Sequence, residues 1–135
     1  MKKTVWATRE LRQYGKKPEK AGPGRRVIYL CLPFEGDVGD YLDRVKEMSR
    51  ILDPDKNVLL FPYLIPIMDD GLDGREAVIA GRQDSRKMID LCDEFWVRDD
   101  RLTANVLAEL AQAVKSEKKI QYLCKEEVDE DELQD

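Results

Sequence analysis

Residues 27–32 read Val-Ile-Tyr-Leu-Cys-Leu, a continuous apolar run rich in strand-forming residues. Runs of this kind are typical of strands that are buried on both faces, as in a parallel sheet. The segment Pro33-Phe34-Glu35-Gly36-Asp37 ends the run with turn-forming residues. We therefore expect the fold to be built around one central, fully buried strand.

Apolar runs and amphipathic segments alternate along the chain that follows this strand. Leucine, valine and methionine recur at helical spacing over residues 42–52, which predicts a helix that ends before Pro54. The pattern then predicts a strand at 57–61, a helix at about 75–92, a strand at 94–97, a helix at about 103–116 and a strand at 119–123. This alternation predicts an α/β protein with a parallel sheet of about four or five strands and right-handed crossovers.

Three loops follow the predicted strands at their carboxyl ends, over residues 33–40, 62–74 and 98–104. In open α/β sheets the ligand crevice lies at the carboxyl ends of the strands, where the strand order reverses. The long connection 62–74 is also of a length that is more often functional than not. We therefore expect a pocket where these loops meet.

The composition limits the chemistry that such a pocket can perform. The chain has 135 residues and no histidine, which excludes Ser-His-Asp and Cys-His nucleophile systems and histidine-ligated metal sites. The cysteines Cys31, Cys92 and Cys124 form no CxxC pair, so we expect a reduced cytoplasmic protein without a metal site or cofactor. No apolar run approaches the roughly 20 residues of a membrane span, and the basic beginning does not resemble a secretory signal.

The net charge of -5 conceals a gradient that suggests three parts. Residues 1–26 form a basic arm with nine Lys or Arg against two Glu, 27–123 form the α/β domain, and 124–135 form an acidic tail with seven acids against one Lys. A basic arm binds nucleic acid in some proteins. Because this one lacks aromatic interleaving and an RNA-binding motif, we favour a solvated terminus, or an arm that lies along the acidic tail of its own or a neighbouring chain.

Few side chains outside the apolar pattern have the chemistry for a site. Glu109 lies within or beside the apolar stripe of the 103–116 helix, where a carboxylate is paired, poised for reaction, or simply exposed. Asp93 precedes the third strand of the domain, and capping, pairing with an arginine and substrate contact all stay open for it. The row Arg75, Arg82 and Arg86 falls on one helix face and fits either a phosphate or acids of the preceding loop.

Four segments in order make the chain similar to a known group. They are VIYLCLPFEGD (27–37), LLFPYLIPIMDDGLDGREAVIAGR (59–82), MIDLCDEFWV (88–97) and LTANVLAELAQAVKSEKKIQYL (102–123). Together they resemble the small proteins related to nucleoside 2-deoxyribosyltransferases, and closer still the uncharacterised branch of that superfamily, a domain of unknown function. The resemblance covers about residues 27–123 and implies a flavodoxin-like, or Rossmann-like, three-layer fold.

The resemblance also implies an activity. Members cleave the N-glycosidic bond of a deoxynucleoside or its monophosphate through a glutamate that forms a covalent sugar ester, and Glu109 corresponds to that nucleophile. Tyr29, Pro33 and Phe34 then line the sugar and base pocket. Thr103 and Asn105 face a 5′-phosphate or hydroxyl, and Asp93 completes our set of substrate-binding candidates. In proteins of this group, two copies often associate so that a loop of one completes the pocket of the other, and the resemblance therefore implies a homo-oligomer.

The chain departs from the group's pattern at three positions. Asn105-Val106 replaces a Gly-Met pair, Tyr63 replaces a histidine, and Ser85 stands where active transferases carry an aspartate, with Asp84 one place away. We therefore expect either a deoxyribosyltransferase or hydrolase that acts on a nucleoside or nucleotide, or a non-catalytic module that binds or senses a nucleotide. A third reading is an assembly protein or nucleic-acid partner that uses the basic arm, although we do not expect nucleic acid as the principal ligand.

Overall fold

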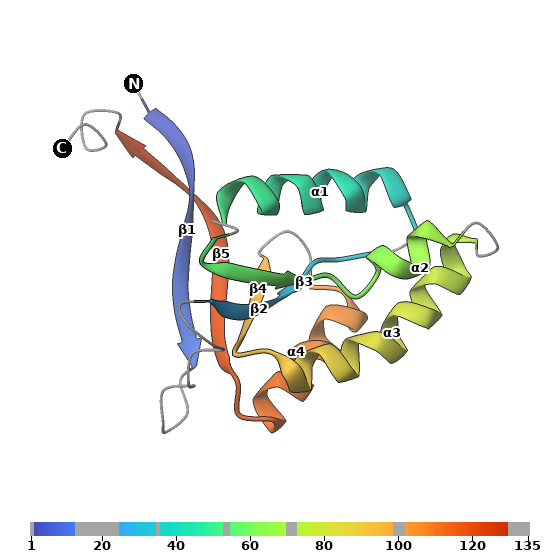
Figure 1. Cartoon of the computed structure of the whole chain (residues 1–135). Coiled ribbons are helices and arrows are strands. Elements are labelled where there is room, and N and C mark those ends of the chain that lie inside the picture. The colour runs from blue at the N-terminus through green and yellow to red at the C-terminus, as the bar shows by residue number, and fades with distance from the viewer. Residues whose placement is uncertain are drawn as a thin grey trace.

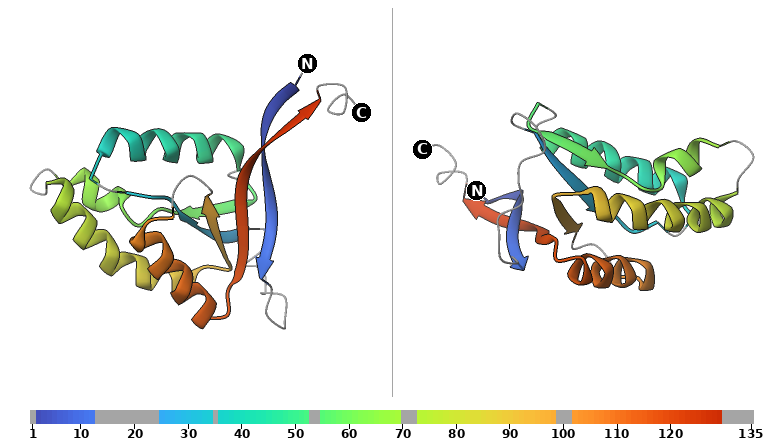
Figure 2. Two further views of the ribbon diagram at one scale, coloured as in Figure 1. Left: turned by 180° about the vertical axis from the view of Figure 1, so that it is seen from behind. Right: turned by 60° about the horizontal axis from the view of Figure 1, so that its bottom comes forward.

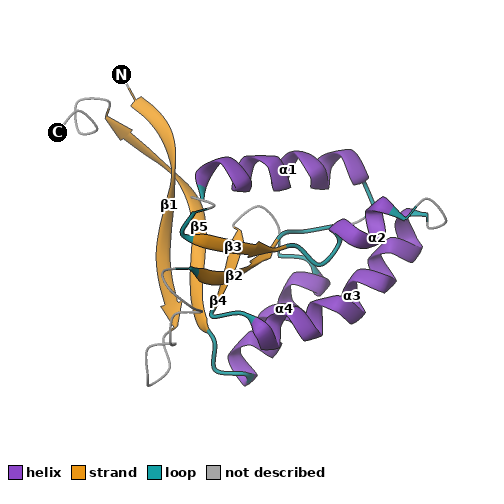
Figure 3. Cartoon of the chain, in the orientation of Figure 1, coloured by secondary structure: helices purple, strands orange, loops and turns teal. Residues whose placement is uncertain are grey.

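The computed structural model describes residues 2–12, 25–34, 36–52, 55–69, 73–98 and 102–129, with residues 9–12 described by their backbone only. In chain order the elements are β1 (Lys2–Arg12), β2 (Arg26–Cys31), α1 (Val38–Ile51), β3 (Asn57–Leu60), α2 (Leu64–Met68), α3 (Gly74–Leu91), β4 (Glu94–Arg98), α4 (Ala104–Lys115) and β5 (Lys119–Asp129). Figures 1 and 3 show these elements as a mixed α/β arrangement around one curled sheet.

The described sheet has five strands in the order β1-β5-β4-β2-β3. Strands β3, β2, β4 and β5 run parallel to their neighbours, and β1 pairs antiparallel with β5. The sheet is therefore mixed, and the prediction of a wholly parallel sheet was wrong at this edge. The apolar pattern could not reveal β1, because its residues are mostly polar or charged and most of its described side chains stay partly or fully exposed.

The pairing of β1 with β5 joins the two oppositely charged ends of the chain. Its register places Lys2 opposite Asp129, a facing pair of opposite charge, whereas Lys3 lies opposite Val128 and Val5 opposite Glu126. Opposite charges on facing strands stabilise a sheet pair, whereas like charges destabilise it. For residues 2–12, the structure thus shows the basic segment lying along the acidic end of its own chain. The sheet extends beyond residues 27–123 in both directions, and Figure 1 shows the ends of β1 and β5 lying together away from the helices.

Helices cover both faces of the parallel strands (Figure 2). Side chains of successive strand residues point to opposite faces. In β2, Ile28 and Leu30 pack in one core cluster with Met48 of α1. Tyr29 and Cys31 pack in a second cluster, whose helical members are Ile89 of α3 with Val106 and Ala113 of α4. The central apolar run thus serves two cores, as its unbroken pattern predicted.

The connection over residues 62–74 contains a short helix that the sequence pattern did not reveal. Helix α2 begins at Leu64, and Pro66 lies in its first turn, where the missing backbone N–H breaks no helical hydrogen bond. The connection is anchored by Tyr63, whose ring lies directly against Gly81 of α3, so that any larger residue at 81 would overlap the ring. Tyr63 therefore fixes the position of α3 beside the carboxyl ends of the strands.

The loop after β2 also contacts the beginning of α3. Gly36 has a φ of +102°, a conformation that favours glycine. A Cβ atom at Gly74 would lie only 2.6 Å from the carbonyl oxygen of Gly36, so the two backbones approach closely. The absence of a side chain at Gly74 therefore lets the backbone at Gly36 lie against the beginning of α3.

Candidate active site

Glu109 is a buried residue of α4, with 7% of its surface exposed. Thr103 caps the helix by accepting a hydrogen bond from the backbone N–H of Val106 at 3.2 Å. This start places Val106, Glu109 and Ala113 on the buried side of α4, because residues three and four apart share a helix face. Of the roles that the sequence left open for Glu109, the structure excludes the exposed one.

Two side chains of β2 donate hydrogen bonds to the Glu109 carboxylate. The Tyr29 hydroxyl donates to Oε1, and the Cys31 thiol donates to Oε2 at 3.9 Å. Tyr29 is itself held by stacking on Phe95 of β4, with ring centroids 5.2 Å apart and an interplanar angle of 9°. Because both oxygens of the carboxylate have a fixed partner, the orientation of Glu109 is determined by the sheet.

The surroundings of Glu109 oppose its ionisation. Burial raises the pKa of Glu109 to about 7, and the hydrogen bonds from Tyr29 and Cys31 and the charge of Arg82 offset part of that effect. Burial, together with the negative charge of Glu109, raises the pKa of Tyr29 and of Cys31 well above their usual values. Near neutral pH, Tyr29 and Cys31 therefore remain protonated donors, and Glu109 is present in both its neutral and ionised forms.

A groove between α3 and α4 leads to Glu109. It consists of two adjoining cavities, of about 460 Å³ and about 270 Å³, that share Arg82 and Asn105 in their walls. Phe34, Arg75, Val78 and Ile79 complete the wall of the larger cavity, and Ser85, Arg86, Ala108, Glu109 and Gln112 complete the smaller one. The carboxylate thus lies in the wall of a cleft that reaches solvent.

Aromatic rings position the wall of the groove that comes from the loop after β2. Phe34 packs against Tyr41 of α1 and Tyr63, with ring centroids 5.2 Å and 5.1 Å away. Tyr41 and Tyr63 meet edge to face at 5.7 Å. Tilted and edge-to-face contacts are the favoured geometries of aromatic pairs. Phe34 is consequently a fixed apolar surface of the larger cavity.

The structure brings together four of the side chains that the sequence singled out. Tyr29 contacts Glu109 directly, while Phe34 and Asn105 line the groove. Thr103 lies at the start of α4, where its hydroxyl is engaged in the helix cap, and Pro33 is buried but lines neither cavity. Ser85, the position of the group's aspartate, lies in the smaller cavity, and its hydroxyl donates to the carbonyl oxygen of Arg82 at 2.9 Å.

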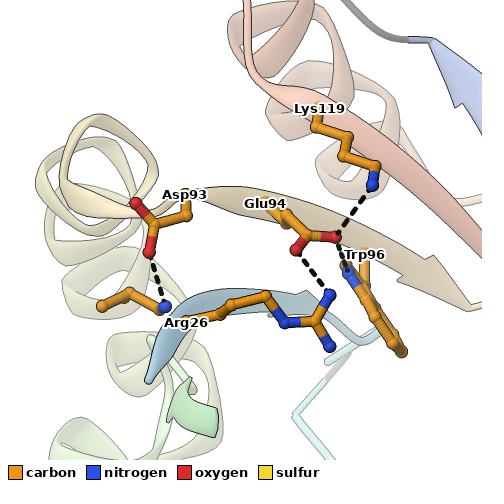
Figure 4. A network of polar contacts seen from close by, with 6 residues as sticks. Arg26, Asp93, Glu94, Trp96 and Lys119 are labelled. Atoms are coloured by element: carbon orange, nitrogen blue, oxygen red, sulfur yellow. Dashed lines mark hydrogen bonds and ion pairs between the residues drawn. The ribbon is translucent and has the colours of Figure 1, made fainter. Parts of the chain in front are cut away.

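Asp93 is not part of this assembly. It lies at the amino end of β4, where its carboxylate accepts the backbone N–H of Val27 at 2.7 Å (Figure 4). The backbone N–H of Asp93 in turn donates to the Val27 carbonyl oxygen at 2.8 Å. The neighbouring Glu94 pairs with Arg26 at 2.7 Å. These contacts join the amino ends of β2 and β4. Asp93 therefore has a structural role.

Sequence reasoning did not assign two features of the groove. Arg82 was seen only as one of three aligned arginines, yet it borders both cavities and its charge acts on Glu109. Cys31 was not among the predicted site residues, yet its thiol faces the carboxylate. Its spacing of two residues from Tyr29 was the available signal, since alternate residues of a strand point to the same face.

The described residues form neither a cluster of metal ligands nor a helix that could span a membrane. Over the described ranges, no three His, Cys, Asp or Glu side chains gather as metal ligands would. In the same part of the chain, no helix has both the length and the apolar character required to cross a membrane.

Fold and groove together define an α/β protein whose buried carboxylate lies in a cleft beside its parallel strands. Residues 26–123 match the family described as Domain of unknown function (DUF7768), and the chain belongs to that family. A comparison with the curated proteins finds no match. The family match begins at the first residue of β2 and ends within β5, so it contains every residue of the groove.

Proposed function

We propose that this chain is an N-glycosidic-bond enzyme, a deoxyribosyltransferase or hydrolase acting on a nucleoside or nucleotide, with Glu109 as nucleophile. The observation that carries the proposal is the fixed, buried Glu109 carboxylate in the wall of a solvent-reaching groove. A carboxylate nucleophile requires no histidine, in agreement with the composition. The resemblance to deoxyribosyltransferase-like proteins, which places Glu109 at the nucleophile position, supports the same assignment.

The proposed reaction proceeds in two displacements, as in retaining glycoside chemistry. A Glu109 oxygen attacks the anomeric carbon of the sugar, the carbon–nitrogen bond breaks, and the base leaves with the electron pair and takes a proton from water. Water or a nitrogen of a second base then attacks the same carbon and releases Glu109 as a carboxylate. The Tyr29 hydroxyl, which donates to Oε1, orients the attacking group and stabilises its ionised form.

The proposal includes a finer description of the fold and its surroundings. The order β3-β2-β4-β5 of the parallel strands, with helices on both faces, supports a flavodoxin-like three-layer arrangement. Its strand order reverses between β2 and β4, and Tyr29, Cys31 and Phe34 of the site come from β2 and the loop that follows it. The three cysteines are all buried and free, which supports a reducing, cytoplasmic setting.

The activity is tested by incubating the protein with 2′-deoxynucleosides, their 5′-monophosphates and free acceptor bases, and measuring released or exchanged base chromatographically. We expect Glu109→Gln to lower the rate by at least about 10³-fold, because the amide cannot form the sugar ester. Mass spectrometry of acid-quenched wild-type protein should show a sugar adduct that Glu109→Gln lacks. Base release at an unchanged rate in Glu109→Gln protein would contradict the assignment.

One observation favours a second candidate, a nucleotide-binding module without turnover. Ser85 occupies the groove position where active transferases of the resembled group carry an aspartate, and its hydroxyl is bonded to backbone. Without that acid, protonation of the leaving base has one fewer source. This candidate predicts nucleotide-dependent thermal stabilisation of the protein with no base release. Thermal-shift measurements beside the activity assay separate the two candidates.

A further inference from the structure

Three arginines of α3 face the groove, and the proposed reaction assigns them no role. Arg75 and Arg82 line the larger cavity, while Arg82 and Arg86 line the smaller one. Their side chains are exposed to solvent. Across the described part of the chain, no ion pair joins any of the three to a carboxylate. The alternative from the sequence, pairing with acids of the preceding loop, is not seen for Asp73, whose carboxylate accepts the backbone N–H of Glu76 at 2.7 Å.

The charge of the groove is opposite in sign to that of the whole chain. The chain carries a net charge of -5, yet among its described residues the wall of the larger cavity contains two guanidinium groups and no carboxylate. The one carboxylate that the described residues contribute to the smaller cavity is Glu109, which burial keeps partly protonated near neutral pH. A concave surface with unpaired guanidinium groups attracts anions, and the planar fork of arginine matches the oxygens of a phosphate.

The beginning of α4 is the other place where a phosphate could bind. The resemblance implies that Thr103 and Asn105 face a 5′-phosphate or hydroxyl there. In the structure, however, the Thr103 hydroxyl accepts the N–H of Val106 at 3.2 Å and so caps the helix. A phosphate at this end would have to compete with that cap for the amide. The arginines of α3 have no such competing partner among the described carboxylates, which favours α3 as the anion-binding wall.

We propose that the substrate is a nucleoside 5′-monophosphate, and that its phosphate binds between the guanidinium groups of Arg75 and Arg82 on α3. This inference rests on the proposed function for the position of the sugar next to Glu109. Phe34, Val78 and Ile79 line the same cavity and supply an apolar surface beside the charged one. Arg82 borders both cavities and is the principal contact, and Arg75 is the second.

Isothermal titration calorimetry tests the phosphate site without requiring turnover. The four 2′-deoxynucleoside 5′-monophosphates and the four matched nucleosides are titrated into the full chain carrying Glu109→Gln, which prevents consumption of the ligand. We expect at least one monophosphate to bind about tenfold or more tightly than its nucleoside, because hydrogen bonds to a charged group are the strong ones. Equal affinity for both members of every pair, or no binding of any monophosphate, overturns the proposal.

Substitutions then locate the phosphate. Adding Arg82→Gln should weaken monophosphate binding by about 10- to 100-fold and change nucleoside binding by less than about twofold, while Arg75→Gln has a smaller effect of the same kind. The matched control is Arg50→Gln, which removes an exposed arginine from the last turn of α1 and should leave both affinities unchanged. Equal loss of both ligands in Arg82→Gln protein, with an unchanged melting temperature, contradicts a phosphate contact.

The two proposals fail in different ways. Monophosphate binding that depends on Arg82, together with no base release by the wild-type chain, supports the phosphate site and contradicts the enzyme proposal. Base release that depends on Glu109 and is equally fast from nucleosides and monophosphates supports the enzyme proposal and contradicts the phosphate site.

Discussion

Two buried glutamates, Glu94 on strand β4 and Glu109 on helix α4, have different kinds of partner. Glu94, with 2% of its surface exposed, lies at the amino end of β4, and Glu109, with 7% exposed, lies in the groove. Glu94 is paired with the guanidinium of Arg26 at 2.7 Å, has the Lys119 ammonium 4.0 Å away, and accepts the Trp96 indole N–H at 3.2 Å (Figure 4). Glu109 is bonded to a hydroxyl and a thiol, both neutral.

This difference separates a carboxylate that is paired with cations from one that is bonded only to neutral donors. A buried carboxylate next to cations is compensated as an ion, and its removal leaves those cations without their partner. A buried carboxylate next to neutral donors stays costly to ionise, as the raised pKa of Glu109 shows. Groups held at such a cost are typical of functional sites, which supports our proposal that Glu109 takes part in a reaction, while the contacts of Glu94 contribute to stability.

Among the substitutions, the largest loss of stability is expected at Glu94. Replacing Glu94 by Gln removes the charge that compensates Arg26 and Lys119, and should lower the free energy of unfolding by about 2–3 kcal/mol. The loss stays below that of a fully buried pair because the Arg26 side chain is 40% exposed and can turn toward water. Urea denaturation followed by circular dichroism measures this change.

The matched control for Glu94→Gln is Glu127→Gln, which changes an exposed glutamate of β5 and should alter stability by less than about 0.5 kcal/mol. Where the Glu94→Gln protein remains folded, it should retain the base-release rate of the wild type. If Glu94→Gln leaves the unfolding curve unchanged, the pairing at the amino ends of the strands is not a source of stability.

Glu109→Gln should stabilise the folded protein, and it should do so only at a pH at which Glu109 of the wild type is ionised in the unfolded chain. The folded protein holds the Glu109 proton up to about pH 7, whereas the unfolded chain releases it at about pH 4.5. Raising the pH through this interval therefore destabilises the wild type, by up to about 3 kcal/mol above pH 7, since one pKa unit corresponds to about 1.4 kcal/mol.

Glutamine cannot ionise, so Glu109→Gln protein should be more stable than the wild type at pH 8, and the difference should shrink as the pH falls toward 4.5. Melting temperatures of both proteins from pH 4.5 to 8.5 measure the trend. A constant difference across that range would show that the carboxylate ionises in the folded protein as it does in water.

The smallest effect is expected at Tyr29. Tyr29→Phe removes the hydroxyl that donates to Glu109, and because this hydrogen bond lowers the pKa of Glu109, its loss should raise that pKa further above 7. The rate should rise with pH in both proteins as Glu109 ionises, with the midpoint shifted upward by about one pH unit in Tyr29→Phe protein. Tyr122→Phe, which removes a hydroxyl from β5, is the control and should not shift the midpoint.

The sequence predicted the parallel strands and the three long helices because each of them has a strong apolar period. Helix α3 was expected at about 75–92 and lies at Gly74–Leu91, and α4 was expected at about 103–116 and lies at Ala104–Lys115. Strand β1 and helix α2 were missed for opposite reasons. The charged residues of β1 have no strand-like apolar pattern, and the two prolines around Tyr63 gave α2 the appearance of an irregular loop.

The sequence was sufficient to predict Glu109 as the principal residue of the candidate site. The spacing of Glu109 from Val106 and Ala113 indicated a carboxylate on or beside the buried face of its helix. The position of Asp93 was not predictable in the same way. Its place next to a strand in the sequence does not specify which residues its side chain contacts. The structure gives it a backbone contact with Val27, on β2, instead of a place in the groove.

The sequence by itself determined that the chain forms a buried sheet with helices on it, and that its chemistry needs no histidine. Apolar periodicity and composition are local properties, so they can be read without knowledge of contacts. Only the tertiary structure decided that Tyr29 and Cys31 meet Glu109, which lies 80 and 78 residues further along the chain. It also decided which buried glutamate is paired with cations, because that difference depends on distances between segments that no local pattern specifies.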